Sequence, residues 1–171
     1  MQKDMKYLYL IRHAKSSWDN LEISDVDRPL NERGLRDAPY MGKRLKEKEV
    51  APDLMLSSPA KRAIATCRQI AAIIGHEASR IKTDPRLYHA SEETLVSVLS
   101  GLSDSHHVAM LFGHNPGLTR LTNSIFGQHI MNIPTCGIVA GKLNIGTWGE
   151  VKAGCGRLGF FDFPKKNKRK G

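Results

Sequence analysis

The chain has 171 residues, of which 40% are hydrophobic and 25% charged, the ordinary composition of a single globular domain. It contains no run of about 18 apolar residues, which excludes a membrane-spanning helix. Three widely spaced cysteines argue against a disulfide framework and a four-cysteine metal site. The polar start lacks the pattern of a signal peptide, so we expect a cytoplasmic protein.

The net charge of +9 is unevenly distributed along the chain. Five of the 26 basic residues lie in the segment 165–171, which has no acidic residue. We therefore expect one domain over residues 1–164 and a disordered basic tail over 165–171. The tail has no aromatic residue, which disfavours binding to nucleic acid. The smaller positive charge of the domain suits an anionic substrate.

The first predicted elements are a strand and a helix separated by a polar loop. Residues 6–11 form an apolar run of the kind found in strands, and it ends at Arg12 and His13. Asn31 is a suitable cap for a helix whose apolar residues recur at helical spacing to about residue 49. Pro52 is expected to end this helix.

A second strand and helix follow in the same order. The strand is expected over 53–56, and Ser58 is a suitable cap for the helix, with Pro59 in its first turn. Gly75 is expected to end this helix. A further short strand is predicted over 81–83.

The rest of the chain continues the alternation and then becomes β-like. Ser91 would cap a helix through residue 100, a buried strand covers 108–112, and another helix extends to about residue 126. Two strands are expected over 138–143 and 158–163. The alternation predicts an α/β three-layer sandwich, a largely parallel central sheet flanked by helices, to which the C-terminal strands can add an antiparallel edge.

Polar residues follow three of the predicted strands. They are Arg12 and His13, Ser57 and Ser58, and His114 and Asn115. Ligands of parallel sheets bind beyond the carboxyl ends of the strands, so we expect these side chains to meet in one crevice. Arg62, one turn into the helix after the second strand, adds a second guanidinium. Two arginines and two histidines would suit a tetrahedral dianion.

Five motifs in order carry a resemblance to a known family. They are residues 12–18, 27–34, 57–63, 86–88 and 113–117. Together they resemble the histidine phosphatase (phosphoglycerate-mutase-like) superfamily and its SixA-type phosphohistidine phosphatase branch. The similarity covers about residues 6–163 and implies the phosphoglycerate-mutase-like fold.

The resemblance implies a role for each residue of the crevice. His13 would be the nucleophile of a phosphohydrolase and would pass through a phosphohistidine intermediate, while Arg12, Arg62 and His114 would hold the phosphoryl oxygens. A neutral imidazole must attack, so a backbone carbonyl near Ala14 could accept from its other nitrogen. No cofactor and no metal would be required, because the basic side chains supply the positive charge.

The resemblance also implies a phosphorylated partner, either a protein that carries phosphohistidine or a small phosphorylated molecule. Three functions are compatible with these residues. A protein phosphohistidine phosphatase is favoured, a small-molecule phosphomonoesterase is the alternative, and a catalytically silent phosphate-binding or phosphoprotein-binding module is disfavoured because all four crevice residues are present.

The proton donor is the part of the site that the sequence leaves open. His89 stands where many relatives carry a glutamate general acid, and Glu92 and Glu93 lie just beyond it. Phosphohistidine has an imidazole leaving group, which needs less protonation than the alkoxide of a phosphate ester. The missing glutamate therefore favours a substrate with a P–N bond.

The loop after the first strand carries charged residues with two possible roles. Asp25, Asp27 and Arg28 are expected to tie down the loop, or alternatively to form an edge of the substrate cleft. A carboxylate beside a phosphate is unfavourable, so Asp19 is expected to point away from the site. Trp18 is expected to pack against the loop.

Overall fold

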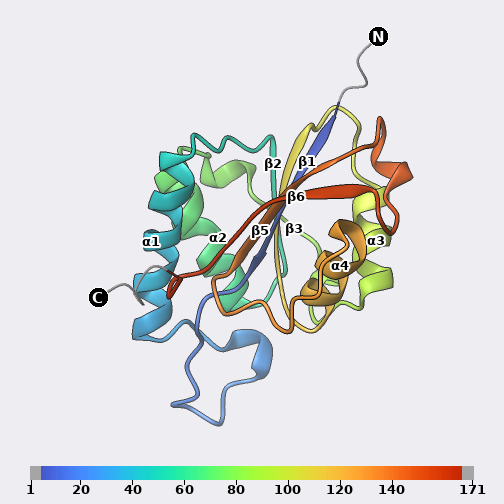
Figure 1. The fold of residues 1–171 in the computed structure, drawn as a ribbon. Helices are drawn as coiled ribbons and strands as arrows, with labels where there is room; N and C mark the ends of the chain where they lie inside the picture. Colours follow the sequence, from blue (N-terminus) through green and yellow to red (C-terminus); the bar gives the residue numbers. More distant parts are fainter. Residues whose placement is uncertain (1–4, 167–171) are drawn as a thin grey trace.

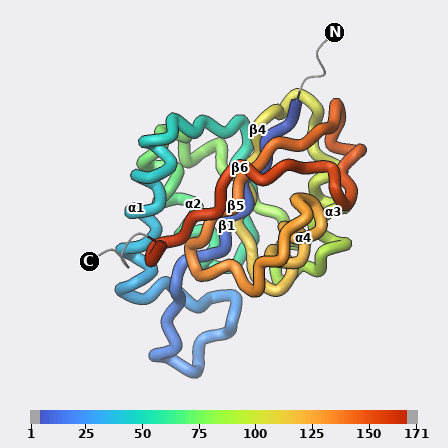
Figure 2. The backbone as a smooth tube through the Cα atoms, viewed as in Figure 1, coloured from blue at the N-terminus to red at the C-terminus, as the bar shows by residue number. Residues whose placement is uncertain are grey.

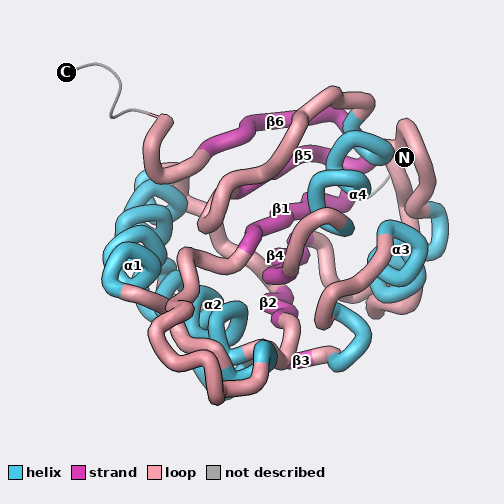
Figure 3. The backbone as a smooth tube through the Cα atoms, turned by 90° about the horizontal axis from the view of Figure 1, so that it is seen from below, coloured by secondary structure: helices cyan, strands magenta, loops and turns pink. Residues whose placement is uncertain are grey.

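The chain folds around one central sheet, and the computed structural model describes residues 5–166. The strands are β1 (Lys6–Arg12), β2 (Leu54–Ser57), β3 (Lys82–Thr83), β4 (Val108–Gly113), β5 (Ile138–Leu143) and β6 (Gly156–Asp162). They cross the centre of the molecule in Figure 1, and Figure 3 shows their order in the sheet, β3-β2-β4-β1-β5-β6. The first four are parallel, whereas β5 and β6 are antiparallel to their neighbours. This confirms the largely parallel sheet with an antiparallel edge.

Four helices form the outer layers. They are α1 (Glu32–Glu47), α2 (Lys61–Ile74), α3 (Glu92–Ser100) and α4 (Gly117–Phe126). Viewed along the sheet, α1 and α2 lie on one face, and α3 and α4 lie on the other (Figure 3). The predicted three-layer α/β sandwich is therefore confirmed. Within residues 5–166, no helix combines the length and the apolar character needed to span a membrane.

Alternating side chains of β1 supply both cores. Leu8 and Leu10 are fully buried in the cluster that α3 and α4 cover, whereas Ile11 is fully buried in the cluster of α1 and α2. This follows from the period of two residues along a strand. Burial of each such side chain contributes roughly 1.5–3 kcal/mol, so the central strand is anchored from both sides.

Local end signals locate most of the helices correctly. The Asn31 side chain accepts a hydrogen bond from the N–H of Gly34, and the Ser91 side chain accepts one from Thr94. Gly75 ends α2 in the left-handed conformation, with φ of 82°. Each of these three end signals is confirmed.

Two details of α1 differ from the expectation. The helix ends at Glu47, and Glu49 has a φ of 58°, so the chain turns before it reaches Pro52. Leu35 is 52% exposed. The buried residues of α1 begin at Gly34 and continue with Asp37, Ala38 and Met41, so Leu35 lies outside the buried stripe.

The expected cap of α2 is wrong. The helix begins at Lys61 after Ala60, with no side chain bonded to its first turn. The Ser58 hydroxyl is fully buried and lies 2.8 Å from Nε2 of His114. The Ser58 side chain therefore contacts His114, a residue distant in sequence, and does not cap α2.

The long connection between β1 and α1 extends beyond the carboxyl ends of the parallel strands (Figure 2). The two ends of this connection lie side by side. The N–H of Asn31 donates to the carbonyl of Lys15, and Ser16 and Leu30 form an isolated antiparallel β-bridge. A Cβ atom at Gly34 would lie 2.2 Å from the Lys15 carbonyl oxygen, so glycine permits this close approach. The connection includes a short 3-10 turn, Asp25–Asp27.

The predicted boundary between domain and tail stays a prediction. The chain forms a turn after β6, in which Lys166 donates its backbone N–H to the carbonyl of Phe163. Most of the expected tail over 165–171 lies outside the described residues.

Candidate active site

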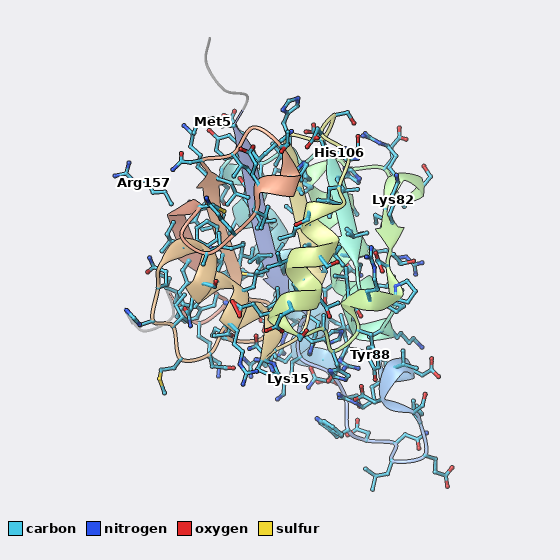
Figure 4. The ribbon with its side chains drawn as sticks, turned by 90° about the vertical axis from the view of Figure 1, so that its right-hand side faces the viewer. Met5, Lys15, Lys82, Tyr88, His106 and Arg157 are labelled. Atoms are coloured by element: carbon cyan, nitrogen blue, oxygen red, sulfur yellow. The ribbon has the colours of Figure 1, made fainter. Side chains whose placement is uncertain are left out.

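One hollow of about 300 Å³ lies at the carboxyl ends of β1, β2 and β4. Lys15 and Tyr88 mark this end of the molecule in Figure 4, opposite the end of Met5 and His106. The residues that line it are Arg12, His13, Lys15, Ser16, Trp18, Arg28, Arg62, His89, His114, Asn115 and Thr135. All four residues of the predicted crevice are therefore brought together.

The ring of His13 is held in one orientation. Its Nδ1 atom lies 2.8 Å from the carbonyl oxygen of Ala14, and the N–H of Ala14 donates to Oγ1 of Thr66 on α2. Since a carbonyl can only accept, Nδ1 carries the proton and Nε2 retains its lone pair. The sequence-based expectation of a carbonyl near Ala14 agrees with this geometry.

The environment of His13 keeps its ring neutral. Burial lowers the pKa of His13 to about 4 against the opposing effect of the Ala14 hydrogen bond, and the charges of Arg62 and Arg12 lower it further. At pH 7 the ring is therefore unprotonated at Nε2.

Two arginines leave donors without protein acceptors. Arg62 is 1% exposed, and its Nη1 and Nη2 atoms donate to the backbone oxygen and carboxylate of Asp25 at 2.6 and 3.0 Å. Arg12 donates from Nη1 to the carbonyl of Ile133 at 2.9 Å. The Nε atoms of both arginines are buried, and they have no hydrogen-bond partner among the described residues. Such donors are costly, and an anion in the hollow could satisfy them.

His114 faces both His13 and Arg62. The ring centroids of the two histidines are 5.2 Å apart, and Nδ1 of His114 is 3.5 Å from Nη2 of Arg62. Burial lowers the pKa of His114 to about 3, and the charges of His13 and Arg62 act in the same direction. The neutral imidazoles of His13 and His114 thus share the hollow with the guanidinium groups of Arg12 and Arg62.

Asp25 is a residue of the site whose importance the sequence did not settle. Its carboxylate accepts from Arg28, Arg62, the hydroxyl of Tyr88 and Nε2 of His89. Burial opposes ionisation of this carboxyl, but these hydrogen bonds outweigh it and hold the pKa of Asp25 well below its usual value. Asp25 therefore ties down the loop and contacts three residues that line the hollow, and of the three charged loop residues it is Arg28 that forms an edge of the hollow itself.

The candidate proton donors are separated by the geometry. His89 lines the hollow, and its ring centroid is 4.9 Å from that of His114. Glu92 and Glu93 occupy the first turn of α3 and are not among the lining residues. The structure therefore brings His89, but neither glutamate, into the site.

The rim carries a stacked pair. The guanidinium of Arg28 lies 3.7 Å from the ring centre of Trp18, which is 63% exposed. Trp18 thus packs on its own loop, as predicted. Asp19 does not line the hollow and belongs to a neighbouring depression beside Leu35.

Among residues 5–166, no group of three or more His, Cys, Asp or Glu side chains is placed to hold a metal ion. Positive charge in the hollow comes from lining side chains, namely Arg12, Arg28, Arg62 and Lys15.

Comparison with known proteins identifies the family. Residues 8–92 match the model of the histidine phosphatase superfamily (branch 1). The chain is 32% identical over 165 residues to an uncharacterised protein of Mycobacterium tuberculosis, covering 91% of this chain and 100% of that protein. It is also 30% identical to an uncharacterised chloroplastic protein of Arabidopsis thaliana, covering 85% of this chain and 70% of the relative.

Solved structures share the whole fold. A protein of Agrobacterium tumefaciens assigned to phosphohistidine phosphatase SixA is 27% identical, with a TM-score of 0.76 over 93% of this chain and 98% of that one. The protein histidine phosphatase SixA complexed with tungstate is 20% identical, with a TM-score of 0.77 over 92% and 97% of the two chains. The sheet, the residues of the hollow and these likenesses agree: the chain is a phosphatase that belongs to the histidine phosphatase superfamily, in its SixA-like branch.

Proposed function

We propose that this phosphatase is a metal-independent phosphohydrolase that acts through a phosphohistidine intermediate on His13, and that its substrate is a protein phosphohistidine. The observation that carries the proposal is the state of His13. Its Nδ1 proton is bound by the Ala14 carbonyl, and the lowered pKa of the ring leaves Nε2 free to attack at neutral pH.

The phosphoryl group would occupy the space between the buried donors. The buried Ser58 hydroxyl accepts from the N–H of Ala60 and lies 2.8 Å from Nε2 of His114. On the other side of the ring, Nδ1 lies 3.5 Å from Nη2 of Arg62, and because a guanidinium can only donate, Nδ1 accepts in this contact. A phosphoryl oxygen placed here would accept from Arg62, and Arg12 supplies a further donor.

The reaction would proceed in two displacements at phosphorus. Nε2 of His13 forms a bond to phosphorus as the bond to the leaving group breaks. Water then attacks the phosphohistidine, the N–P bond breaks, and phosphate leaves. Arg12 and Arg62, with the neutral ring of His114 beside them, neutralise the charge of the phosphoryl oxygens in both steps, which is the main requirement of phosphoryl transfer.

The choice of a P–N substrate is supported by the proton donors available. Among residues 5–166 no glutamate lines the hollow, and the His89 side chain, which does line it, is 51% exposed. An imidazole leaving group needs less protonation than an alkoxide, so this site suits phosphohistidine better than an ester. The likeness to proteins named SixA supports the same substrate class.

One set of assays tests the proposal. A phosphohistidine peptide, p-nitrophenyl phosphate and sugar phosphates are compared side by side, each with excess chelator. We expect activity to survive the chelator and kcat/KM to be highest for the phosphohistidine peptide. A preference for a sugar phosphate would instead favour a small-molecule phosphomonoesterase, and activity that a divalent ion restores would contradict metal independence.

A further inference from the structure

Asp25 and His89 form a pair that lies at the rim of the hollow. Nε2 of His89 is 2.9 Å from Oδ2 of Asp25, although 64 residues separate the two in sequence. We propose that Asp25 is the positioning residue of a proton-transfer pair, which keeps the proton on Nε2 of His89 and leaves Nδ1 to exchange a proton with the substrate. The inference rests on the proposed phosphohydrolase function.

The geometry around Asp25 makes it an acceptor toward His89. The carboxylate also accepts from Arg28, Arg62 and Tyr88, all of which are donors in these contacts. With four donor groups around it the carboxylate stays ionised, so its bond to Nε2 requires a proton on that nitrogen. An ionised carboxylate therefore selects the tautomer of His89, as the aspartate of a catalytic triad does for its histidine.

The backbone and neighbouring rings orient His89 toward the hollow. Its φ is 48°, a conformation that is uncommon for residues other than glycine and that often accompanies functional constraint. The next residue, Ala90, is held by close packing: its carbonyl oxygen would lie 2.0 Å from a Cβ atom at Gly117, so only glycine fits there. The ring lies against Tyr88 and His114, with centroid distances of 4.3 and 4.9 Å.

The ring of His89 has one nitrogen available for chemistry. Within residues 5–166, its hydrogen bond is made by Nε2 to Asp25. Because the residue lines the hollow, Nδ1 is the nitrogen left for the leaving group or for water.

The proposed pair completes both displacements with balanced protons. In the first, the bond from phosphorus to the leaving nitrogen of phosphohistidine, or to the leaving oxygen of an ester, breaks. Its electron pair goes to that leaving atom, and the Nδ1 proton of the His89 imidazolium moves to the same atom. In the second, water attacks the phosphohistidine on His13, the N–P bond breaks, and the proton released by water returns to Nδ1. Asp25 keeps its hydrogen bond to Nε2 throughout and is not itself protonated.

A double-mutant cycle with two ester substrates tests this role. Phenyl phosphate has a poor leaving group that needs protonation, and p-nitrophenyl phosphate has a better one. We expect Asp25→Asn to lower kcat for phenyl phosphate about 10- to 100-fold and kcat for p-nitrophenyl phosphate by less than about threefold. His89→Ala should show the same selectivity, and Asp25→Asn should add less than about twofold in the His89→Ala background.

Asp27→Asn is the matched control. Asp27 lies in the same 3-10 turn and has the same charge, but it is exposed, and its side chain accepts from Ser24. We expect this variant to leave kcat for both substrates unchanged. Inhibition by inorganic phosphate verifies that the anion site of each variant is intact.

Additive losses in the double variant would overturn the proposal, because Asp25 would then act through Arg62 or the loop. Equal losses for both esters would overturn it as well. The tautomer can be measured without any variant by ¹⁵N NMR of the histidine rings: we expect the neutral ring of His89 to carry its proton on Nε2, and a proton on Nδ1 instead would overturn the proposal. A wild-type protein that hydrolyses neither ester nor the phosphohistidine peptide would instead refute the proposed function.

Discussion

Oγ of Ser58 lies 2.8 Å from Nε2 of His114, and the two residues are 56 positions apart in the chain. The contact joins the segment after β2 to the segment after β4, and these strands are neighbours in the sheet. Their carboxyl ends therefore place a buried hydroxyl beside a buried imidazole. This hydroxyl holds the ring of His114 in place beside His13 and Arg62.

Ser58→Ala should therefore lower kcat/KM, and the folded protein should remain intact enough for this loss to be measured. Without the hydroxyl, Nε2 of His114 loses its hydrogen-bond partner and the ring is no longer held in one orientation. We expect kcat/KM to fall roughly 3- to 10-fold, the effect of one hydrogen bond of about 1 kcal/mol.

Ser57→Ala is the matched control for this variant. Ser57 is equally buried, and its hydroxyl donates to the carbonyl of Ser58 rather than to a ring of the site. Thermal unfolding should show a similar destabilisation of both variants, whereas the loss of kcat/KM should be confined to Ser58→Ala. Equal losses of kcat/KM would show that the effect is general to the strand end.

Arg62→Ala should lower kcat by roughly 10² to 10³, the usual cost of removing one preorganised charge-stabilising donor. Arg62 is buried, and it also carries the contact between α2 and Asp25. Arg68→Ala, an exposed change on the same helix, should leave kcat unchanged. Steady-state kinetics of both variants make the comparison, and an Arg62→Ala enzyme with full activity would refute the assigned role.

His13→Ala should abolish turnover, because Nε2 of this ring is the proposed nucleophile. Brief exposure of the wild-type protein to substrate labelled in its phosphoryl group, followed by rapid quench, should place the label on His13. Peptide mapping identifies the labelled residue. A label on a serine or an aspartate would contradict the mechanism.

Activity should persist to unusually low pH for a histidine nucleophile. The pKa of His13 is lowered to about 4, so the attacking neutral form remains dominant as the pH falls from 7 to about 5. We expect kcat/KM in the free enzyme to decline only as the pH approaches 4. A decline centred near the ordinary histidine value of about 6.5 would mean that the ring is less buried than the structure shows.

The same pKa shift predicts how stability depends on pH. Between about 4 and 6.5, the unfolded chain protonates His13 while the folded chain does not, so lowering the pH through this window favours unfolding. The slope from one such ring is at most about 1.4 kcal/mol per pH unit. Denaturant titrations at several pH values should show a weaker acid destabilisation for His13→Ala than for the wild type.

Truncation after Pro164 should leave the turnover of small substrates unchanged, because the described residues that line the hollow lie between Arg12 and Thr135 in the chain. Assays with p-nitrophenyl phosphate before and after truncation make this comparison. A large loss would connect the basic segment to the site.

Local sequence signals predicted the architecture because they act over a few residues. Asn31 and Ser91 cap their helices through bonds to residues three positions away, and Gly75 ends α2 through its own backbone conformation. The position of the crevice could also be predicted, since parallel strands place their carboxyl ends at one edge. Arg12, His13, Arg62 and His114 therefore meet where the alternating pattern places them.

The partners of these residues depend on the packing of segments that are distant in sequence. The sequence predicts that Ser58 caps a helix. In the structure its hydroxyl contacts His114 instead, because β2 and β4 are adjacent. The sequence predicts that Asp25 ties down its own loop. In the structure the loop folds back, and the carboxylate of Asp25 accepts from Arg62, Tyr88 and His89. Each side chain has several possible hydrogen-bond partners of similar energy, so the strand order and the path of the loop determine which of them is close enough to bond.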